Sequence, residues 1–171
     1  MIANEAMERD NAKMLAEFLH AKQTYDDQDY IYHIDMVVYV LERFGIHDED
    51  AILAAYLHDS VEDTTATLKL IEKYFGKEVM LLVNAVTNEQ GLNRKERNIK
   101  TYHKLMQHPN AIVVKLADRI ANVEQALSKG NMRFFKMYAD EYPSFKYYLK
   151  AVSPEKAKTL WEHLDKLFET K

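Results

Sequence analysis

Apolar residues recur at helical spacing along most of the chain. The pattern is clearest from 51 to 65, where Leu53, Leu57 and Val61 fall at i, i+4 and i+8 and form one apolar stripe of a helix. Similar stripes, several of them ended by glycine or proline, predict further helices. The predicted helices span about 4–22, 31–44, 51–65, 65–74, 77–86, 94–107, 111–127, a Tyr- and Phe-rich segment ending near 152, and 154–168. We therefore expect an all-α fold, a single helical bundle of about nine helices, with a loop at 24–30.

Composition indicates one compact helical domain over residues 1–171. Hydrophobic residues make up 47% of the chain, and only four glycines and three prolines interrupt it. Because there are no cysteines, a disulfide framework and a thiolate zinc site are excluded. The N-terminal segment is charged, and no apolar run approaches the roughly 18 residues that span a bilayer. We expect a soluble, cytoplasmic protein without a membrane partner.

Charge narrows the classes of partner. The net charge of -4 argues against general binding to the nucleic-acid backbone, so we expect no nucleic-acid partner. The basic cluster of Arg94, Lys95, Arg97 and Lys100 is better explained as one rim of a pocket. The aromatic run from Phe134 to Tyr148 is typical of core or dimer contacts, which leaves a homo-oligomer open.

Candidate chemistry gathers at the end of the predicted 51–65 helix. One imidazole and three carboxylates share its last turn, contributed by His58, Asp59, Glu62 and Asp63. A helix C-terminus already carries partial negative charge, so something cationic should offset these carboxylates. Hard oxygens combined with a nitrogen suit a divalent metal. The alternative is a solvated acidic helix end.

A second unusual position is Asp118, which lies inside the most apolar helix of the chain. An ionised carboxylate left unpaired there would cost on the order of several kcal/mol, so a cation, a proton or a metal must neutralise it. Lys115 and Arg119 offer the alternative of a structural ion pair.

Four of these side chains form a candidate set of metal ligands. The set combines a histidine at the start of a helix, an adjacent His-Asp pair and a distant aspartate: His33, His58, Asp59 and Asp118. Two imidazoles and two carboxylates leave open positions on a Mn-, Fe- or Zn-type ion, where water and a phosphate oxygen can bind. Such a site is hydrolytic. No Gly-rich phosphate loop, HExxH or GxSxG motif competes with it.

The order His, His-Asp, Asp resembles the HD-domain metal-dependent phosphohydrolases. Within that superfamily, the strings HDSVEDT, FGKEV with LV and VT, and VKLADR with Asn122 resemble the hydrolase domain of RelA/SpoT-type proteins and their small stand-alone relatives. The resemblance covers about 15–127 and implies a single HD-type domain with its core at about 15–152. It also implies removal of the 3′-pyrophosphate from the alarmones ppGpp and pppGpp in the stringent response, with Mn2+ as the metal and a small-molecule nucleotide as substrate.

In that family the residues that match Glu62 and Asp63 are catalytic. A carboxylate beside the metal can accept a proton from water or orient it, so Glu62 is our first choice for the base and Asp63 for orienting the water. The alternative is that both carboxylates help to hold His33 in its tautomer.

The resemblance also implies contacts to the substrate, at Lys22, Arg94, Asn122, Arg133 and Tyr138. Lys22 and Arg94 would bind phosphates, and Tyr138 would stack on a base. The alternative for each position is an ordinary surface cation or a core tyrosine.

Three departures from the family pattern bear on the substrate. Ile34 follows the first histidine where proline is usual, the loop before Tyr30 is acidic where it is usually basic, and Glu124 stands where an arginine is common. We expect these departures to make the pocket less positive. Two alternatives therefore stay open: hydrolysis of another nucleotide, such as NADPH or a deoxynucleotide, and nucleotide sensing without turnover.

Overall fold

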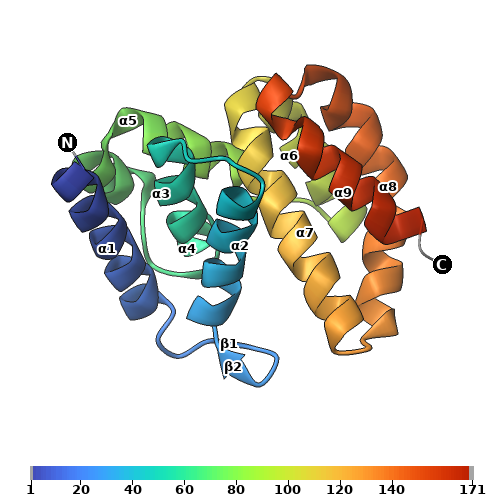
Figure 1. Ribbon diagram of the computed structural model, residues 1–171, viewed down its shortest axis with the longest axis horizontal. Helices are drawn as coiled ribbons and strands as arrows, with labels where there is room; N and C mark the ends of the chain where they lie inside the picture. The colour runs from blue at the N-terminus through green and yellow to red at the C-terminus, as the bar shows by residue number, and fades with distance from the viewer. Residues whose placement is uncertain (1, 170–171) are drawn as a thin grey trace.

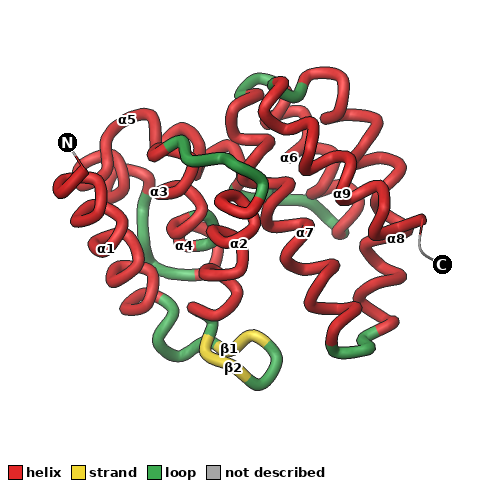
Figure 2. Tube along the Cα trace, viewed as in Figure 1, coloured by secondary structure: helices red, strands yellow, loops and turns green. Residues whose placement is uncertain are grey.

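The computed structural model describes residues 2–169. Within this range the fold consists of nine α-helices, three short 3-10 helices and one two-stranded hairpin, which confirms the prediction of an all-α fold (Figures 1 and 2). The α-helices are α1 (Ile2–Leu19), α2 (Ile31–Arg43), α3 (Glu49–Leu57), α4 (Ser60–Asp63), α5 (Leu68–Val86), α6 (Arg94–Met106), α7 (Ile112–Ser128), α8 (Met132–Leu149) and α9 (Lys158–Glu169). The hairpin is β1 (Thr24–Tyr25) with β2 (Gln28–Asp29), and the 3-10 helices lie at Pro109–Ala111, Lys150–Val152 and Glu155–Ala157.

The helices form two groups that meet at α7. In Figure 1, α1 to α5 lie on one side of α7, and α6, α8 and α9 lie on the other. Helix α2 packs along α7, and α8 and α9 pack on it from the second group. Most apolar residues of α7, including Leu116, Ile120 and Val123, are fully buried. Because α7 lies between the two groups, its polar side chains lie where the groups meet.

Side-chain caps fix where several helices begin. Asp48 accepts a hydrogen bond from the backbone of α3, and Thr67 does the same for α5. Asn93 and Asn131 cap α6 and α8 in the same way. Such caps satisfy backbone N–H groups that have no partner inside the helix.

The predicted helix at 51–65 is wrong in its extent, because the structure divides it. Helix α3 ends at Leu57, and the single turn α4 starts only at Ser60. The His58 imidazole Nδ1 lies 2.8 Å from the carbonyl oxygen of Ala55, the atom that a continuing helix would bond to the backbone of Asp59. Asp59 has φ -96° and ψ -4°, away from helical values. The carboxylates that follow therefore lie on a separate turn.

The predicted break at Gly76 is confirmed, because its φ of 87° and ψ of 171° lie outside the helical range and divide α5 into two helical parts. One other boundary differs from prediction. Helix α9 begins at Lys158 rather than Pro154, which is extended at ψ 155° and precedes the 3-10 turn at 155–157. The residues predicted as a loop at 24–30 instead contain the small antiparallel hairpin, which pairs Thr24 with Asp29.

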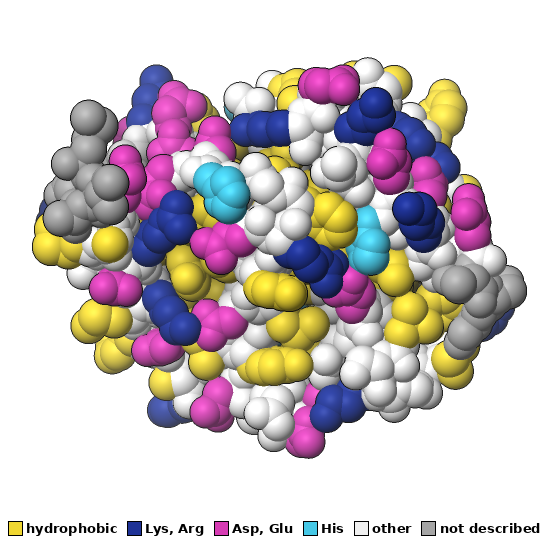
Figure 3. Space-filling view, viewed as in Figure 1, with side chains coloured by type: hydrophobic (Ala, Val, Ile, Leu, Met, Phe, Trp, Pro, Cys, Tyr) yellow, Lys and Arg dark blue, Asp and Glu magenta, His cyan; other side chains and the backbone are white. Residues whose placement is uncertain are grey.

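The surface carries charges of both signs. On the face shown in Figure 3, Lys and Arg side chains lie among Asp and Glu side chains. Among the helices of the described residues, none is both long and apolar enough to cross a lipid bilayer.

Candidate active site

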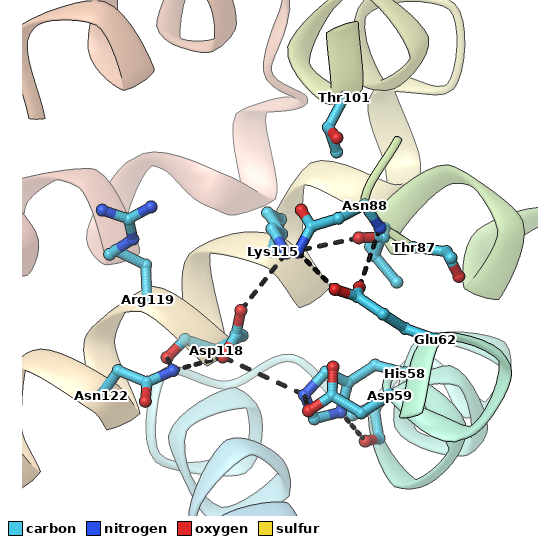
Figure 4. Close-up of polar contacts among 12 residues, drawn as sticks. His58, Asp59, Glu62, Thr87, Asn88, Thr101, Lys115, Asp118, Arg119 and Asn122 are labelled. Carbon is cyan, nitrogen blue, oxygen red and sulfur yellow. Dashed lines mark hydrogen bonds and ion pairs between the residues drawn. The ribbon is translucent and has the colours of Figure 1, made fainter. Parts of the chain in front are cut away.

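Three of the predicted metal ligands come together from separate helices. His33, His58 and Asp118 each offer one ligand atom, and these three atoms lie within 4.8 Å of one another. The Nε2 atom of His33 lies 3.5 Å from Asp118 Oδ1, and that of His58 lies 4.0 Å from the same oxygen. The first turn of α2, the end of α3 and the middle of α7 therefore converge on one point. Figure 4 shows the side chains from α3 and α7 pointing toward each other.

Asp59 adds a carboxylate to this cluster. Its Oδ2 atom lies 3.0 Å from His58 Nε2 and 3.8 Å from His33 Nε2. The hydroxyl of Tyr30 donates a hydrogen bond of 2.6 Å to the same oxygen and so fixes the carboxylate. Asp59 is thus placed as the fourth residue of the predicted set.

The donor atoms fit a divalent cation. The His58 side chain is 2% exposed, and its Nδ1 contacts the Ala55 carbonyl, which leaves the Nε2 lone pair directed at the carboxylates. Among the described residues this buried Nε2 has no hydrogen-bond partner. Converging nitrogen and oxygen lone pairs repel one another unless a proton or a metal lies between them.

The pKa shifts of the cluster, taken without a metal, also favour a bound cation. Burial lowers the pKa of His58, but the adjacent Asp59 carboxylate outweighs it and raises the pKa to about 9. Burial raises the pKa of Asp118, but Lys115 and the two histidines outweigh it and hold the pKa well below its usual range. The carboxylates are therefore ionised and attract positive charge to the cluster.

Glu62 and Asp63 lie at the edge of the cluster, and both line its cavity. The Glu62 carboxylate accepts two hydrogen bonds of 3.0 Å from Asn88, one from its backbone N–H and one from its side-chain amide (Figure 4). Burial, Asp59 and Glu62 raise the pKa of Asp63. Among the described residues His33 Nδ1 has no hydrogen-bond partner, so neither carboxylate holds its tautomer here.

A cavity of about 190 Å³ opens over the cluster. Its walls combine three of the four candidate ligands, the carboxylates of Glu62 and Asp63, several amides and aromatic rings, and three cations. The lining residues are Tyr25, Tyr30, His33, Asp59, Glu62, Asp63, Asn88, Arg94, Asn98, Tyr102, Lys115, Asp118, Arg119, Asn122 and Tyr138. Three of the five predicted substrate residues, Arg94, Asn122 and Tyr138, are therefore in the cavity wall.

The arginines of the cavity are held by one acid on α8. Glu141 binds Arg94 and lies 3.0 Å from Arg119, which stacks over the ring of Tyr138 at 4.8 Å. The two arginines lower the pKa of Glu141 below its usual range, although burial opposes them. In Figure 4, Arg119 points away from the ligand cluster. Glu141 thus offsets part of the positive charge at this end of the cavity.

Two polar residues of α7 complete the wall next to Asp118. Lys115 Nζ lies 3.5 Å from Asp118 Oδ2, so the ion pair predicted as the alternative to a metal is present beside the metal cluster. The Asn122 amide donates to Asp118 Oδ1 at 2.5 Å, and its own oxygen accepts from the Tyr25 hydroxyl at 2.9 Å.

Lys22 and Arg133 do not line this cavity. Lys22 is exposed after α1. Arg133 lines a separate groove of about 650 Å³ between α6 and α8, which shares Arg94 and Asn98 with the cavity. Their contact with substrate stays a prediction.

The expected effect of Glu124 on the pocket is wrong. Its carboxylate lies 2.7 Å from Arg43 Nη2 and 2.6 Å from His163 Nε2, and it is absent from the cavity wall. Position 124 falls on the stripe of α7 that contacts α2 and α9. An i+2 step from Asn122 turns a helical side chain to a different face.

Sequence reasoning missed several residues of the wall. Tyr25 lies in the hairpin and Tyr30 directly after it, in a segment predicted as a loop, and Asn88 fixes Glu62 from a distant loop. A tyrosine three positions after a predicted helix or before a histidine carries no chemical signal of its own. Only the fold brings these hydroxyl and amide groups to the ligands.

Comparison with known proteins agrees with this geometry. A family model described as HD domain matches residues 12–133. The chain is 35% identical over 113 residues to guanosine-3′,5′-bis(diphosphate) 3′-pyrophosphohydrolase MESH1 of Drosophila melanogaster, which covers 63% of each protein. It is 35% identical over 127 residues to human MESH1, covering 71% of each. An Aquifex aeolicus enzyme named guanosine-3′,5′-bis(diphosphate) 3′-pyrophosphohydrolase is 37% identical over 101 residues, or 57% of this chain and only 14% of that enzyme.

Solved structures share the fold. A metazoan ortholog of SpoT, described as hydrolysing ppGpp, superposes with a TM-score of 0.72 at 25% identity and covers 95% of this chain and 94% of its own. A Listeria monocytogenes protein, lmo0812, superposes with a TM-score of 0.63 at 22% identity, over 81% of this chain and 97% of its own.

Proposed function

This chain belongs to the HD-domain family, and we propose that it is a metal-dependent phosphohydrolase that removes the 3′-pyrophosphate of ppGpp and pppGpp. The observation that carries the proposal is the convergence of His33, His58 and Asp118 from three helices at a cavity that also contains two arginines. The names of the relatives give the substrate class.

The roles of the chain's own residues follow from their positions. A divalent cation held by His33, His58, Asp59 and Asp118 would polarise a phosphate and lower the pKa of a nearby water. Glu62, fixed by Asn88, accepts a proton from the attacking water. In the net reaction, water adds to phosphorus, the bond from phosphorus to the ribose 3′ oxygen breaks, and that oxygen gains a proton.

The cavity wall binds the phosphates. Arg94, Lys115 and Arg119 supply positive charge at the site, and Tyr138 offers an aromatic face for the base. Asp63 orients the attacking water from beside Glu62. Lys22 and Arg133 contact the outer part of the substrate.

Further features of the proposal concern the metal and the setting. We propose Mn2+, the metal implied by the resemblance to RelA/SpoT-type hydrolases, and two imidazoles with two carboxylates are compatible with such an ion. We also propose that residues 1–171 act as one HD-type hydrolase domain in the cytoplasm and the stringent response, with no nucleic-acid or membrane partner. A homo-oligomer stays open.

The test is a product screen. The purified protein with Mn2+ is incubated with ppGpp, NADPH, dGTP and nucleoside monophosphates, and released phosphate and pyrophosphate are separated and quantified. We expect pyrophosphate and GDP from ppGpp. Turnover of NADPH or dGTP alone would contradict the substrate and keep the reaction type, whereas tight nucleotide binding without any released product would indicate a sensor.

One observation favours the second candidate, hydrolysis of a different nucleotide. The hairpin that precedes His33 carries Asp26, Asp27 and Asp29, which do not line the cavity but add negative charge to the hairpin whose Tyr25 does. A highly phosphorylated ligand that approaches past the hairpin is repelled by this charge. The same screen separates the two candidates.

A further inference from the structure

The hairpin formed by β1 and β2 places one aromatic residue on the metal cluster. The ring of Tyr25 stacks on the ring of His33, with centroids 4.6 Å apart and planes 27° apart. Its hydroxyl donates a hydrogen bond of 2.9 Å to Asn122 Oδ1 on α7. Tyr25 therefore joins one ligand of the cluster to the opposite wall of the cavity.

Tyr25 also stands between two cavities. The cavity over the cluster has about 190 Å³, and a second cavity of about 70 Å³ lies on the other side. Tyr25, Asn122 and Tyr138 line both. Pockets that enclose a whole ligand usually have about 300–1,000 Å³, so neither cavity alone takes a nucleotide. With Tyr25 in this position, the site accommodates phosphate groups better than a nucleoside.

The hairpin is held in place by α7. Asp26 accepts a hydrogen bond of 2.9 Å from the amide of Gln125, which is 4% exposed, and Asp27 accepts one of 3.2 Å from Lys129. Together with the Tyr25 bond, three consecutive hairpin residues contact successive turns of one helix. The position of Tyr25 is therefore specified by the fold.

The hydrogen bonds of the Asn122 side chain determine how Tyr25 affects ligand binding. The side-chain N–H₂ of Asn122 is committed to the backbone oxygen and the carboxylate of Asp118, at 3.0 and 2.5 Å. Its oxygen is the group left to recognise a ligand, and the Tyr25 hydroxyl occupies it. Because Tyr25 takes one of the two acceptor positions of this oxygen, a ligand that donates an O–H or N–H to Asn122 competes with the Tyr25 hydroxyl.

We propose that Tyr25 is a specificity-determining residue, which competes with the hydroxyl or N–H donors of a nucleotide for the oxygen of Asn122. This inference rests on the proposed function, because it concerns the substrate class of the same site. Phosphate compounds that lack such a donor reach the ligand cluster without displacing Tyr25. A nucleotide therefore binds at the expense of the Tyr25–Asn122 hydrogen bond, whereas a small phosphate compound binds without breaking it.

The test removes only the hydroxyl. Tyr25→Phe keeps the ring on His33 and releases Asn122, and Tyr39→Phe, an exposed tyrosine on α2, is the matched control. Both changes are made in a Glu62→Gln background so that ligands are not consumed. Binding of ppGpp and of inorganic pyrophosphate is measured by calorimetry with Mn2+. We expect Tyr25→Phe to lower the Kd of ppGpp about two- to tenfold, the effect of one hydrogen bond, and to leave the Kd of pyrophosphate unchanged.

Several outcomes would overturn the inference: a Kd for ppGpp that is unchanged or higher, equal changes for both ligands, or the same change in Tyr39→Phe. No binding of ppGpp to either Tyr25 form would also overturn it. Failure of the proposed function alone has a different signature, since the protein with Glu62 intact would then bind ppGpp but release no pyrophosphate from it.

Discussion

Replacing Glu141 with glutamine tests how much its ion pairs with Arg94 and Arg119 contribute to stability. The carboxylate lies 3.0 Å from Arg119 Nη1, and the two side chains are 14% and 7% exposed. Removing one partner of a buried ion pair costs about 3–5 kcal/mol, because the remaining charge stays buried without compensation. The bond to Arg94 adds little, since that side chain is 45% exposed and surface pairs contribute about 0–1 kcal/mol. We expect Glu141→Gln to lower the free energy of unfolding by about 3 kcal/mol.

The measurement is urea unfolding at neutral pH followed by tryptophan fluorescence. The chain has one tryptophan, Trp161, which is 3% exposed and packs on Phe145 at 5.4 Å. Phe145 in turn lies under the guanidinium of Arg119 at 4.9 Å. The reporter therefore sits next to the perturbed region. Because the substitution also leaves more positive charge in the cavity, added phosphate should recover more stability in the variant than in the wild type.

The pH dependence has a defined sign. The pKa of Glu141 is lowered in the folded protein, so its contribution is complete above the ordinary value of 4.5 and is lost as the pH falls through the folded pKa. The difference between wild type and variant should be constant between about pH 6 and 8 and shrink below about pH 4.5.

Asp140→Asn is the matched control, since it removes the same charge from the neighbouring residue. Asp140 is exposed and lies 3.8 Å from Lys136, so its loss should change the unfolding free energy by less than about 0.5 kcal/mol. If Glu141→Gln destabilised the protein no more than Asp140→Asn, the buried pairing of Arg119 would not contribute as argued.

Three further predictions concern the ligand cluster. Asp118→Ala should abolish metal binding, measured by elemental analysis, together with phosphohydrolase activity, and wild-type turnover would refute the site. Glu62→Ala should keep the metal content and lower kcat by about two to four orders of magnitude, and loss of the metal would instead make Glu62 a ligand. Tyr30→Phe removes the donor to Asp59 and should weaken metal affinity about tenfold to a hundredfold in chelator competition, whereas an unchanged affinity would mean that this bond does not position the carboxylate.

Much of the fold follows from the apolar pattern, because burial of a helical stripe is a property of the local sequence. The break at Gly76 was predicted, because glycine readily takes the positive φ found there. The division of the segment at 51–65 after Leu57 was not predicted. It arises because the side chain of His58 contacts a backbone carbonyl oxygen, and the spacing of apolar residues carries no sign of that contact.

The candidate ligands could be predicted from the sequence for a reason other than helical periodicity. His58, Asp59 and Asp118 are polar groups at positions whose neighbours are buried, and such groups require a partner. The rest of the wall could not be found in this way. Tyr25 and Asn88 lie in segments whose apolar residues show no regular spacing. Glu124 points away from the cavity because it lies on a different face of α7 from Asn122.

The candidate ligands belong to two helices of the first group and to α7, on which the second group packs, and this has a mechanical consequence. One ion bound by His33, His58 and Asp118 would act as a reversible staple between α2, α3 and α7. Amide protons of these helices would then exchange with deuterium more slowly after loading, and proteases would cut the chain less readily. Chelation would loosen the contacts between the first group of helices and α7, so resistance to digestion would report the metal status of the protein.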